Sequence, residues 1–144
     1  MNVKKLVLAL GLIAAPAFAV SDAVMHRDPG CGCCVQWAAQ VRKAFGRSVK
    51  IVDDVNRAAL QRKVGLPVEL ASCHTALIDG LAFEGHVPIA DMKRVLASKP
   101  KGARGLAVAG MPIGSPGMEV PGRTADRYSV VAFGTRKPFL YARH

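Results

Sequence analysis

The chain of 144 residues has room for one domain of ordinary size, and its hydrophobic fraction of 51% excludes a disordered chain. The formal net charge is +10, but lysine and arginine are scattered along the chain rather than interleaved with aromatic residues, which argues against a nucleic-acid partner. We therefore expect a small globular protein with a solvated basic surface.

Residues 1–19 are predicted to be a secretory signal peptide. Two lysines precede an apolar run over residues 6–15, and residues 17–19 (Ala-Phe-Ala) form a small-x-small cleavage site. The apolar run is shorter than the ~20 residues that cross a membrane. We expect export to the periplasm, cleavage before Val20, no membrane association afterwards, and one mature domain over residues 20–144.

The next residues alternate between strand and helix patterns. In chain order, we expect strands over residues 23–27 and 48–52, helices over 34–45 and 55–64, strands over 74–78 and 81–84, and a helix over 88–99. The second helix is expected to turn Val55, Ala58, Ala59 and Leu60 inward. Asp79-Gly80 lies between two of the strands and is a strong signal for a two-residue hairpin.

The predicted order β-α-β-α-β-β-α indicates an α/β protein with a thioredoxin-like core. Helices that alternate with strands predict a parallel strand pair, and the hairpin adds an antiparallel pair. Residues 101–144 are rich in glycine and proline and are predicted to form a C-terminal extension on this core. Within the extension, we expect strands over 128–133 and 139–141.

Cys31-Gly32-Cys33-Cys34 lies between the first predicted strand and the first predicted helix. Unpaired N–H groups and the dipole of a helix N-terminus stabilise a thiolate at such a position. Cys31 and Cys34 have the CxxC spacing of a redox pair, but Cys33 is an additional thiol that such a pair does not need. Three neighbouring thiolates repel one another, and a soft cation offsets the repulsion. Cu(I) suits this site, with Zn(II) as its competitor.

Cys73 directly precedes the third predicted strand, and His74 is its first residue. In a chain with a thioredoxin-like core, the loop before this strand lies against the CxxC motif and usually carries a cis-proline. This sequence has two candidate metal ligands there instead. The alternative interpretation is a buried cysteine beside a hydrogen-bonded histidine.

His86, Met111 and Met118 are further candidate ligands. His86 lies just before the start of a predicted helix, so the alternative is that it is a helix-start residue and not a metal ligand. The two methionines flank a loop rich in proline and glycine, where thioethers suit Cu(I) but also serve as core packing. Trp37, one turn into the first helix, is expected either to pack in the core or to cover the site.

Taken together, the motifs resemble a family of small exported metal-binding proteins that was long known only as a domain of unknown function and includes the CopG-type copper-resistance proteins. The resemblance covers nearly all of residues 23–134, and its motifs are at residues 31–34 with Trp37, 72–75, 84–88 and 110–119. It implies a thioredoxin-like fold in the periplasm and copper held by the CxCC cysteines. It also implies a role in copper resistance, with interconversion of Cu(I) and Cu(II).

Three hypotheses follow. The first is a copper-binding protein that holds one or several Cu(I) ions and meets other periplasmic copper-handling proteins. The second is a thiol–disulfide oxidoreductase in which Cys31 attacks and Cys34 resolves. The third, ranked last, is an exported domain with two structural disulfides. The sequence leaves open whether the first hypothesis includes enzymatic copper oxidoreduction. The candidate metal ligands are Cys31, Cys33, Cys34, Cys73, His74, His86, Met111 and Met118.

Overall fold

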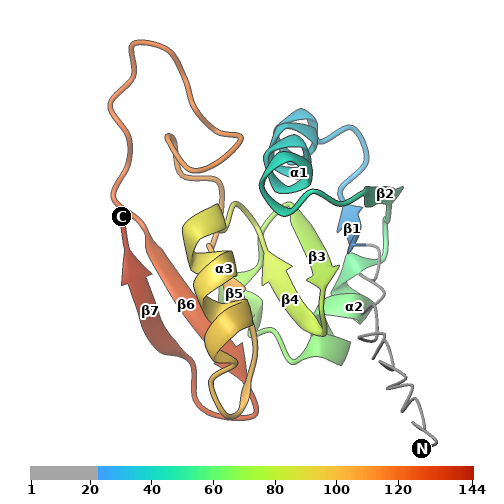
Figure 1. Ribbon diagram of the computed structural model, residues 1–144. Helices are drawn as coiled ribbons and strands as arrows, with labels where there is room; N and C mark the ends of the chain where they lie inside the picture. The colour runs from blue at the N-terminus through green and yellow to red at the C-terminus, as the bar shows by residue number, and fades with distance from the viewer. Residues whose placement is uncertain (1–22) are drawn as a thin grey trace, which may run out of the picture.

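The computed structural model describes residues 23–144, so the predicted signal peptide lies outside the described residues. This part of the chain is a mixed α/β fold with one seven-stranded sheet and three α-helices (Figure 1). The elements are β1 Ala23–Arg27, α1 Gly32–Phe45, β2 Val49–Asp53, α2 Arg57–Val64, the 3₁₀ turn η1 Val68–Leu70, β3 His74–Ile78, β4 Leu81–Glu84, α3 Ile89–Ser98, β5 Ala103–Ala107, β6 Ser129–Gly134 and β7 Phe139–Arg143.

The first part of the fold follows the predicted order of elements up to the end of α3. The strands lie in the order β2-β1-β3-β4-β5-β6-β7. Strand β1 is parallel to β2 and antiparallel to β3. The hairpin between β3 and β4 turns at Asp79 and Gly80, whose φ angles are 49° and 82°. Positive φ at both positions is what a two-residue hairpin turn requires, and the predicted hairpin is confirmed.

The sheet is the middle layer of three. Helices α1 and α3 cover one face of it, and α2 lies on the other face (Figure 1). The larger core, between the sheet and the helices α1 and α3, includes Cys34, Trp37, Met92, Phe83 and Leu106. The smaller core includes Leu66, Ala82, Ala107 and Phe133. Because β3 and β4 alternate their side chains between the two cores, both faces of the central strands are buried.

Helix α2 does not bury the face that the sequence predicted. Val55 precedes the helix and is 92% exposed, and Ala58 and Ala59 are also exposed. The buried residue of this helix is Arg57, which is 8% exposed. The prediction was wrong because it followed apolar periodicity. The side chain of Arg57 is buried instead, where it contacts the buried carboxylate of Glu84 and donates to the carbonyl oxygen of Ser72.

The C-terminal segment extends the sheet. Strand β5 pairs in parallel with β4, and β6 and β7 follow in antiparallel order. Strands β6 and β7 were predicted, and β5 was not. Residues 108–128, which connect β5 to β6, form a long segment that we call the strap; it returns to the end of the molecule where α1 lies (Figure 1).

None of the helices in residues 23–144 combines the length and the hydropathy that a membrane span requires.

Candidate metal centre

The CxCC motif forms the first turn of α1. Cys31 is the N-cap residue, with extended backbone angles, and the helix proper begins at Gly32. Cys31 and Cys33 are partly exposed, whereas Cys34 points into the core and is fully buried. The motif therefore presents two thiol positions toward solvent and one toward β3.

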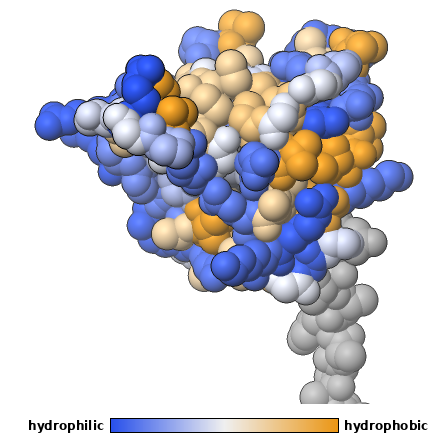
Figure 2. Space-filling view, turned by 90° about the horizontal axis from the view of Figure 1, so that it is seen from above, coloured by the Kyte–Doolittle hydropathy of each residue, from blue (hydrophilic) through white to orange (hydrophobic). Residues whose placement is uncertain are grey.

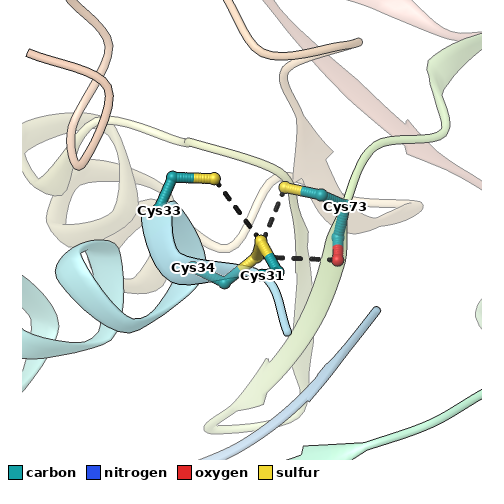
Figure 3. A group of neighbouring side chains, drawn as sticks. All are labelled: Cys31, Cys33, Cys34 and Cys73. Carbon is teal, nitrogen blue, oxygen red and sulfur yellow. Dashed lines mark hydrogen bonds between the residues drawn. A yellow bond between two sulfur atoms is a disulfide. The ribbon is translucent and has the colours of Figure 1, made fainter. Parts of the chain in front are cut away.

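Four sulfur atoms meet at this turn (Figure 3). Cys31 and Cys34 form a disulfide, while Cys33 and Cys73 are free. The Cys33 sulfur lies 3.4 Å from that of Cys31, and the Cys73 sulfur lies 3.4 Å from that of Cys34. All four sulfur atoms lie within 4.8 Å of one another. The predicted proximity of Cys73 to the CxCC motif is therefore observed.

Cys73 also belongs to a second group of ligand atoms, with His74 and His86. Its sulfur lies 3.2 Å from His86 Nε2 and 3.6 Å from His74 Nδ1. All three residues are buried, and their ligand atoms lie within 4.8 Å of one another. Burial raises the pKa of the Cys73 thiol to about 11, so the metal-free thiol is protonated at neutral pH. Cys73 is thus the residue that the two groups share.

The orientation of the His86 ring is set by the strap. His86 Nδ1 lies 2.8 Å from the carbonyl oxygen of Pro116, which can only accept a hydrogen bond, so Nδ1 must donate. Burial lowers the pKa of His86 and favours the neutral ring. In the neutral ring, Nε2 then carries a lone pair that faces the Cys73 sulfur. Metal-binding histidines usually donate their other N–H group in this way.

His74 has an unsatisfied ring nitrogen. The residue is fully buried, and its Nε2 is without a hydrogen-bond partner among residues 23–144. Desolvation, with smaller contributions from His86 and Arg57, lowers the pKa of His74 to about 3, so the ring is neutral. An unpaired buried nitrogen costs free energy. The other ring nitrogen, Nδ1, lies beside the Cys73 sulfur, and with the four sulfur atoms and the lone pair of His86 it fits a soft or borderline metal ion such as Cu(I) or Zn(II).

Trp37 forms a wall of the site rather than a lid. Its ring is fully buried, and its centroid lies 4.5 Å from that of His74. Its indole N–H donates to the carbonyl oxygen of Val87 at 3.0 Å. Of the two interpretations that the sequence left open, core packing is the one observed.

The strap lies against the first turns of α1. A Cβ atom on Gly117 would lie 2.7 Å from the backbone nitrogen of Trp37 and 2.8 Å from the carbonyl oxygen of Cys33. The carboxylate of Glu119 accepts hydrogen bonds from Gln40 of α1 and from the Gly117 backbone. Only glycine allows this close approach, which brings the Pro116 carbonyl to His86.

The predicted methionine ligands also lie on the strap. Met111 is 52% exposed, and Met118 is partly buried. Figure 2 shows the molecule from above Figure 1, where residues of apolar character gather near the centre and hydrophilic residues surround them. Helix α1 and the strap, at this end, expose Val35, Met111 and Val120. Met111 is therefore one of the apolar side chains that this end of the molecule leaves open to solvent.

Sequence reasoning missed three contributors to the site. The carboxylate of Glu84 and the guanidinium of Arg57 are buried beside the Cys73 loop, and the Pro116 carbonyl contacts His86. A backbone carbonyl leaves no signal in the residue type. Arg57 lies in a short helix without a clear apolar stripe, so its burial was not visible either.

Two of three comparisons with known proteins find relatives of this chain. A family model described as "Protein of unknown function, DUF411" matches residues 70–118, which include Cys73, His74, His86 and both methionines of the strap. A solved structure titled "Copper resistance protein copG- Form 1" is 36% identical, with a TM-score of 0.78, over 88% of this chain and 98% of that chain. The corresponding "Form 2" is 37% identical, with a TM-score of 0.76, over 85% and 97%. The search of the curated proteins found no match.

Proposed function

Because the chain belongs to the family of the CopG copper resistance proteins, we propose that it is a copper-binding protein of copper resistance that holds Cu(I) on its cysteine cluster. The observation that carries this proposal is the set of four sulfur atoms within 4.8 Å of one another. A structural domain needs no such cluster, and a redox pair needs only two of its members.

The proposed ligand set follows from the donor atoms that meet at the site. Thiolate sulfur is the preferred ligand of Cu(I), and neutral imidazole suits both copper and zinc. Because Cys73 belongs to both ligand groups, its thiolate is suited to bridge two ions, and we propose that the site holds more than one. The thioethers of Met111 and Met118 complete the set, which otherwise consists of Cys31, Cys33, Cys34, Cys73, His74 and His86.

The disulfide couples metal binding to reduction. Cys31 and Cys34 become ligands only after their bond is reduced, which consumes two electrons and two protons from a dithiol donor. We propose that the protein cycles between this disulfide form and the thiolate form. In the return step, two thiolates form one disulfide and release two electrons, which reduce two Cu(II) ions to Cu(I). Other copper-handling proteins are the proposed source and acceptor of the ion.

The fold type and the location are part of the same proposal. A thioredoxin-like core is supported by the strand order β2-β1-β3-β4 and by a CxxC disulfide at the start of α1. A periplasmic location, after removal of residues 1–19, is supported by the sequence pattern of that segment and by a disulfide, which persists in oxidising compartments.

A second candidate function is thiol–disulfide exchange with other proteins. The Cys31–Cys34 disulfide favours it, because the partly exposed Cys31 has the position of an attacking thiol. This candidate gives no role to Cys33 or to the imidazole group, so we rank it below copper binding.

The deciding experiment measures metal content and free thiols on protein purified anaerobically after growth with copper. We expect one or more equivalents of copper and thiols that react only after a chelator is added. Cys33→Ser should sharply weaken copper binding and leave disulfide exchange largely intact. A metal-free protein whose Cys31–Cys34 disulfide cycles with dithiol reductants would instead establish the second candidate, and zinc in place of copper would keep the site but change its metal.

A further inference from the structure

A single guanidinium connects the two loops that carry the cysteines. Arg57 is 8% exposed and donates from Nε to the Asp28 carboxylate at 2.9 Å. Its Nη2 donates to the carbonyl oxygen of Ser72 at 2.6 Å, and its Nη1 lies 3.5 Å from Glu84 Oε1. Asp28 lies three residues before Cys31, and Ser72 directly precedes Cys73. Arg57 therefore contacts both cysteine-bearing loops without contacting a sulfur atom.

Glu84 holds the same loop from the other side. Its carboxylate is fully buried and accepts hydrogen bonds from the Ser72 backbone N–H at 2.7 Å and from Gln61 at 2.8 Å. The Thr75 hydroxyl donates to its second oxygen. Burial raises the pKa of the Glu84 carboxyl, and its four donors, Arg57 among them, act in the opposite direction and favour the charged carboxylate. The N–H and C=O groups of Ser72 are thus both fixed by side chains of this ion pair.

Backbone hydrogen bonds carry the constraint to the sulfur atoms. The Asp28 N–H donates to the carbonyl oxygen of Cys73 at 3.0 Å, and the Cys31 N–H donates to the carbonyl oxygen of Asp28 at 3.2 Å. Asp28 is therefore bound to both loops and to Arg57. This short chain of contacts joins the two loops whose cysteines, Cys34 and Cys73, hold their sulfur atoms 3.4 Å apart.

Stability alone does not account for the arrangement. A buried ion pair is weak evidence for stability, because the desolvation of two charges offsets their attraction. The geometry here is specific in another way, since one planar group with a fixed fork of donors spans three acceptors on three separate segments.

We propose that Arg57, oriented by Glu84, is the positioning residue of the metal centre: it ties the loop before Cys31 to the loop before Cys73 and thereby sets the spacing of the sulfur ligands. The inference rests on the proposed function, in which these sulfur atoms bind Cu(I). It assigns a role to a residue that contacts neither the metal nor its ligands.

The test compares two arginine-to-lysine substitutions in the purified protein. Arg57→Lys keeps the positive charge, but one ammonium group cannot reach the acceptors on Asp28, Ser72 and Glu84 together. Arg47→Lys is the matched control, because Arg47 forms an ion pair with two hydrogen bonds to Asp79. Asp79 follows the last residue of β3, whereas His74 is the first residue of that strand, so this ion pair lies away from the metal centre. Affinity for Cu(I) is measured by competition with a chelator, and the near-ultraviolet thiolate-to-copper absorption is recorded.

We expect Arg57→Lys to weaken Cu(I) binding roughly 10- to 100-fold, as substitutions of residues that orient metal ligands do, and to alter the absorption band. Arg47→Lys should change neither. If Arg57→Lys fails to fold, Asp28→Ala and Glu84→Gln take its place. Asp28 has a side chain that is 57% exposed, so its removal leaves no cavity, and glutamine keeps the volume of Glu84. Parental affinity and an unchanged band in every folded variant would overturn the proposal.

A second measurement separates this proposal from the proposed function. In the reduced, metal-free protein, the alkylation rate of Cys73 reports directly how firmly its loop is held. We expect Arg57→Lys or Asp28→Ala to raise that rate several-fold, with no change in Arg47→Lys. If the parent protein binds no copper, the proposed function fails, and the alkylation rates still decide whether Arg57 positions Cys73: a rate equal to the parent's refutes it.

Discussion

Strands β1 to β4 and strands β5 to β7 belong to one sheet, yet they contribute different kinds of atoms to the proposed metal centre. The first part, with α1, brings the four cysteines and the two clustered imidazoles. The second part, with the strap, brings the Pro116 carbonyl that orients His86, and it carries the two methionines. The thiol and imidazole ligands therefore come from the first part, whereas the backbone group that orients His86 comes from the second.

The contrast has a physical origin. Thiols and imidazoles meet where β1 ends, α1 begins and β3 begins, because these points share one end of the sheet. The strap arrives from a distant part of the sequence and binds through backbone atoms, so its contribution depends on how closely it approaches α1. Loss of a sulfur ligand in the first half should therefore lower copper affinity more than any substitution on the strap.

Cys73→Ser is expected to have the largest effect. The Cys73 sulfur belongs to both groups of ligand atoms, the four sulfur atoms and the group with His74 and His86, so its loss removes a ligand from both. We expect Cu(I) affinity to fall by more than about 100-fold, since even residues that merely orient ligands contribute 10- to 100-fold. Competition with a Cu(I) chelator measures the affinity, and metal analysis measures the number of bound ions.

Ser72→Ala is the control for this substitution. It removes the Ser72 hydroxyl, which donates to the Gly110 carbonyl oxygen and lies 3.8 Å from the Cys73 sulfur, and it keeps the Cys73 sulfur itself and both backbone contacts of Ser72. If Cys73→Ser keeps the affinity and ion count of Ser72→Ala, the sulfur cluster is not the copper site.

Acid should destabilise the metal-free protein, because His74 in β3 is buried as a neutral ring. In the unfolded chain the pKa of His74 returns to about 6.5, whereas burial first, and then His86 and Arg57, lower it to about 3 in the fold. Between these values only the unfolded chain takes up the proton, so stability present above pH 6.5 is lost as the pH falls. From pH 7 to pH 4 the loss from His74 amounts to about 3 kcal/mol.

Urea unfolding of metal-free protein at the two pH values measures this loss. His74→Leu removes the titrating ring and should flatten the dependence by about the same amount, although its stability at pH 7 also changes. Cys73, His86 and Trp37, which lie against His74, and Arg57, whose charge acts on it from a distance, are unchanged in that variant. A loss of stability with acid that is equal in parent and variant would show that His74 is not a buried neutral ring.

The two halves also differ in how far the sequence predicted them. The hairpin at Asp79-Gly80 and the CxCC turn were predicted because local residue types demand them. The proximity of Cys73 to that turn followed from the order of the elements. Strand β5 was missed because its sequence, Ala-Arg-Gly-Leu-Ala, has neither strict alternation nor β-branched residues, and its pairing with β4 decides its structure.

The parts of the site that escaped prediction depend on contacts between distant segments. Arg57 is buried because three acceptors converge on it, and such convergence exists only in the folded chain. The predicted inward position of Val55 failed for the same reason, since the short helix α2 is positioned by polar contacts rather than by an apolar stripe. The Pro116 carbonyl is a backbone group, and because every residue has one, the sequence does not show which carbonyl contacts His86.

Gly117→Ala probes the strap. The added Cβ would lie 2.7 Å from the Trp37 nitrogen at a residue whose φ is +83°, so the strap must move away from α1. We expect a loss of about 1–3 kcal/mol of stability. The Pro116 carbonyl should retreat from His86, and copper affinity should fall about tenfold, at the lower end of the effect of orienting groups.

Gly110→Ala is the matched control. Gly110 is also on the strap and also has a positive φ of +65°, but nothing lies within 4 Å of the added Cβ. The difference between the two variants therefore isolates the contact with α1. If folded samples of the two variants bind copper with equal affinity, the strap does not orient His86.

Met118→Leu and Met111→Leu are expected to have the smallest effects. Leucine keeps the approximate volume of methionine and removes only the thioether, which is a weaker ligand than a thiolate. We expect Met118→Leu to lower Cu(I) affinity by less than about tenfold, or 1.4 kcal/mol, and Met111→Leu, with a side chain 52% exposed, to lower it less. If either variant loses as much affinity as Cys73→Ser, the contrast between the two parts of the molecule is wrong. The strap would then supply a ligand as strong as any in the first half of the sheet.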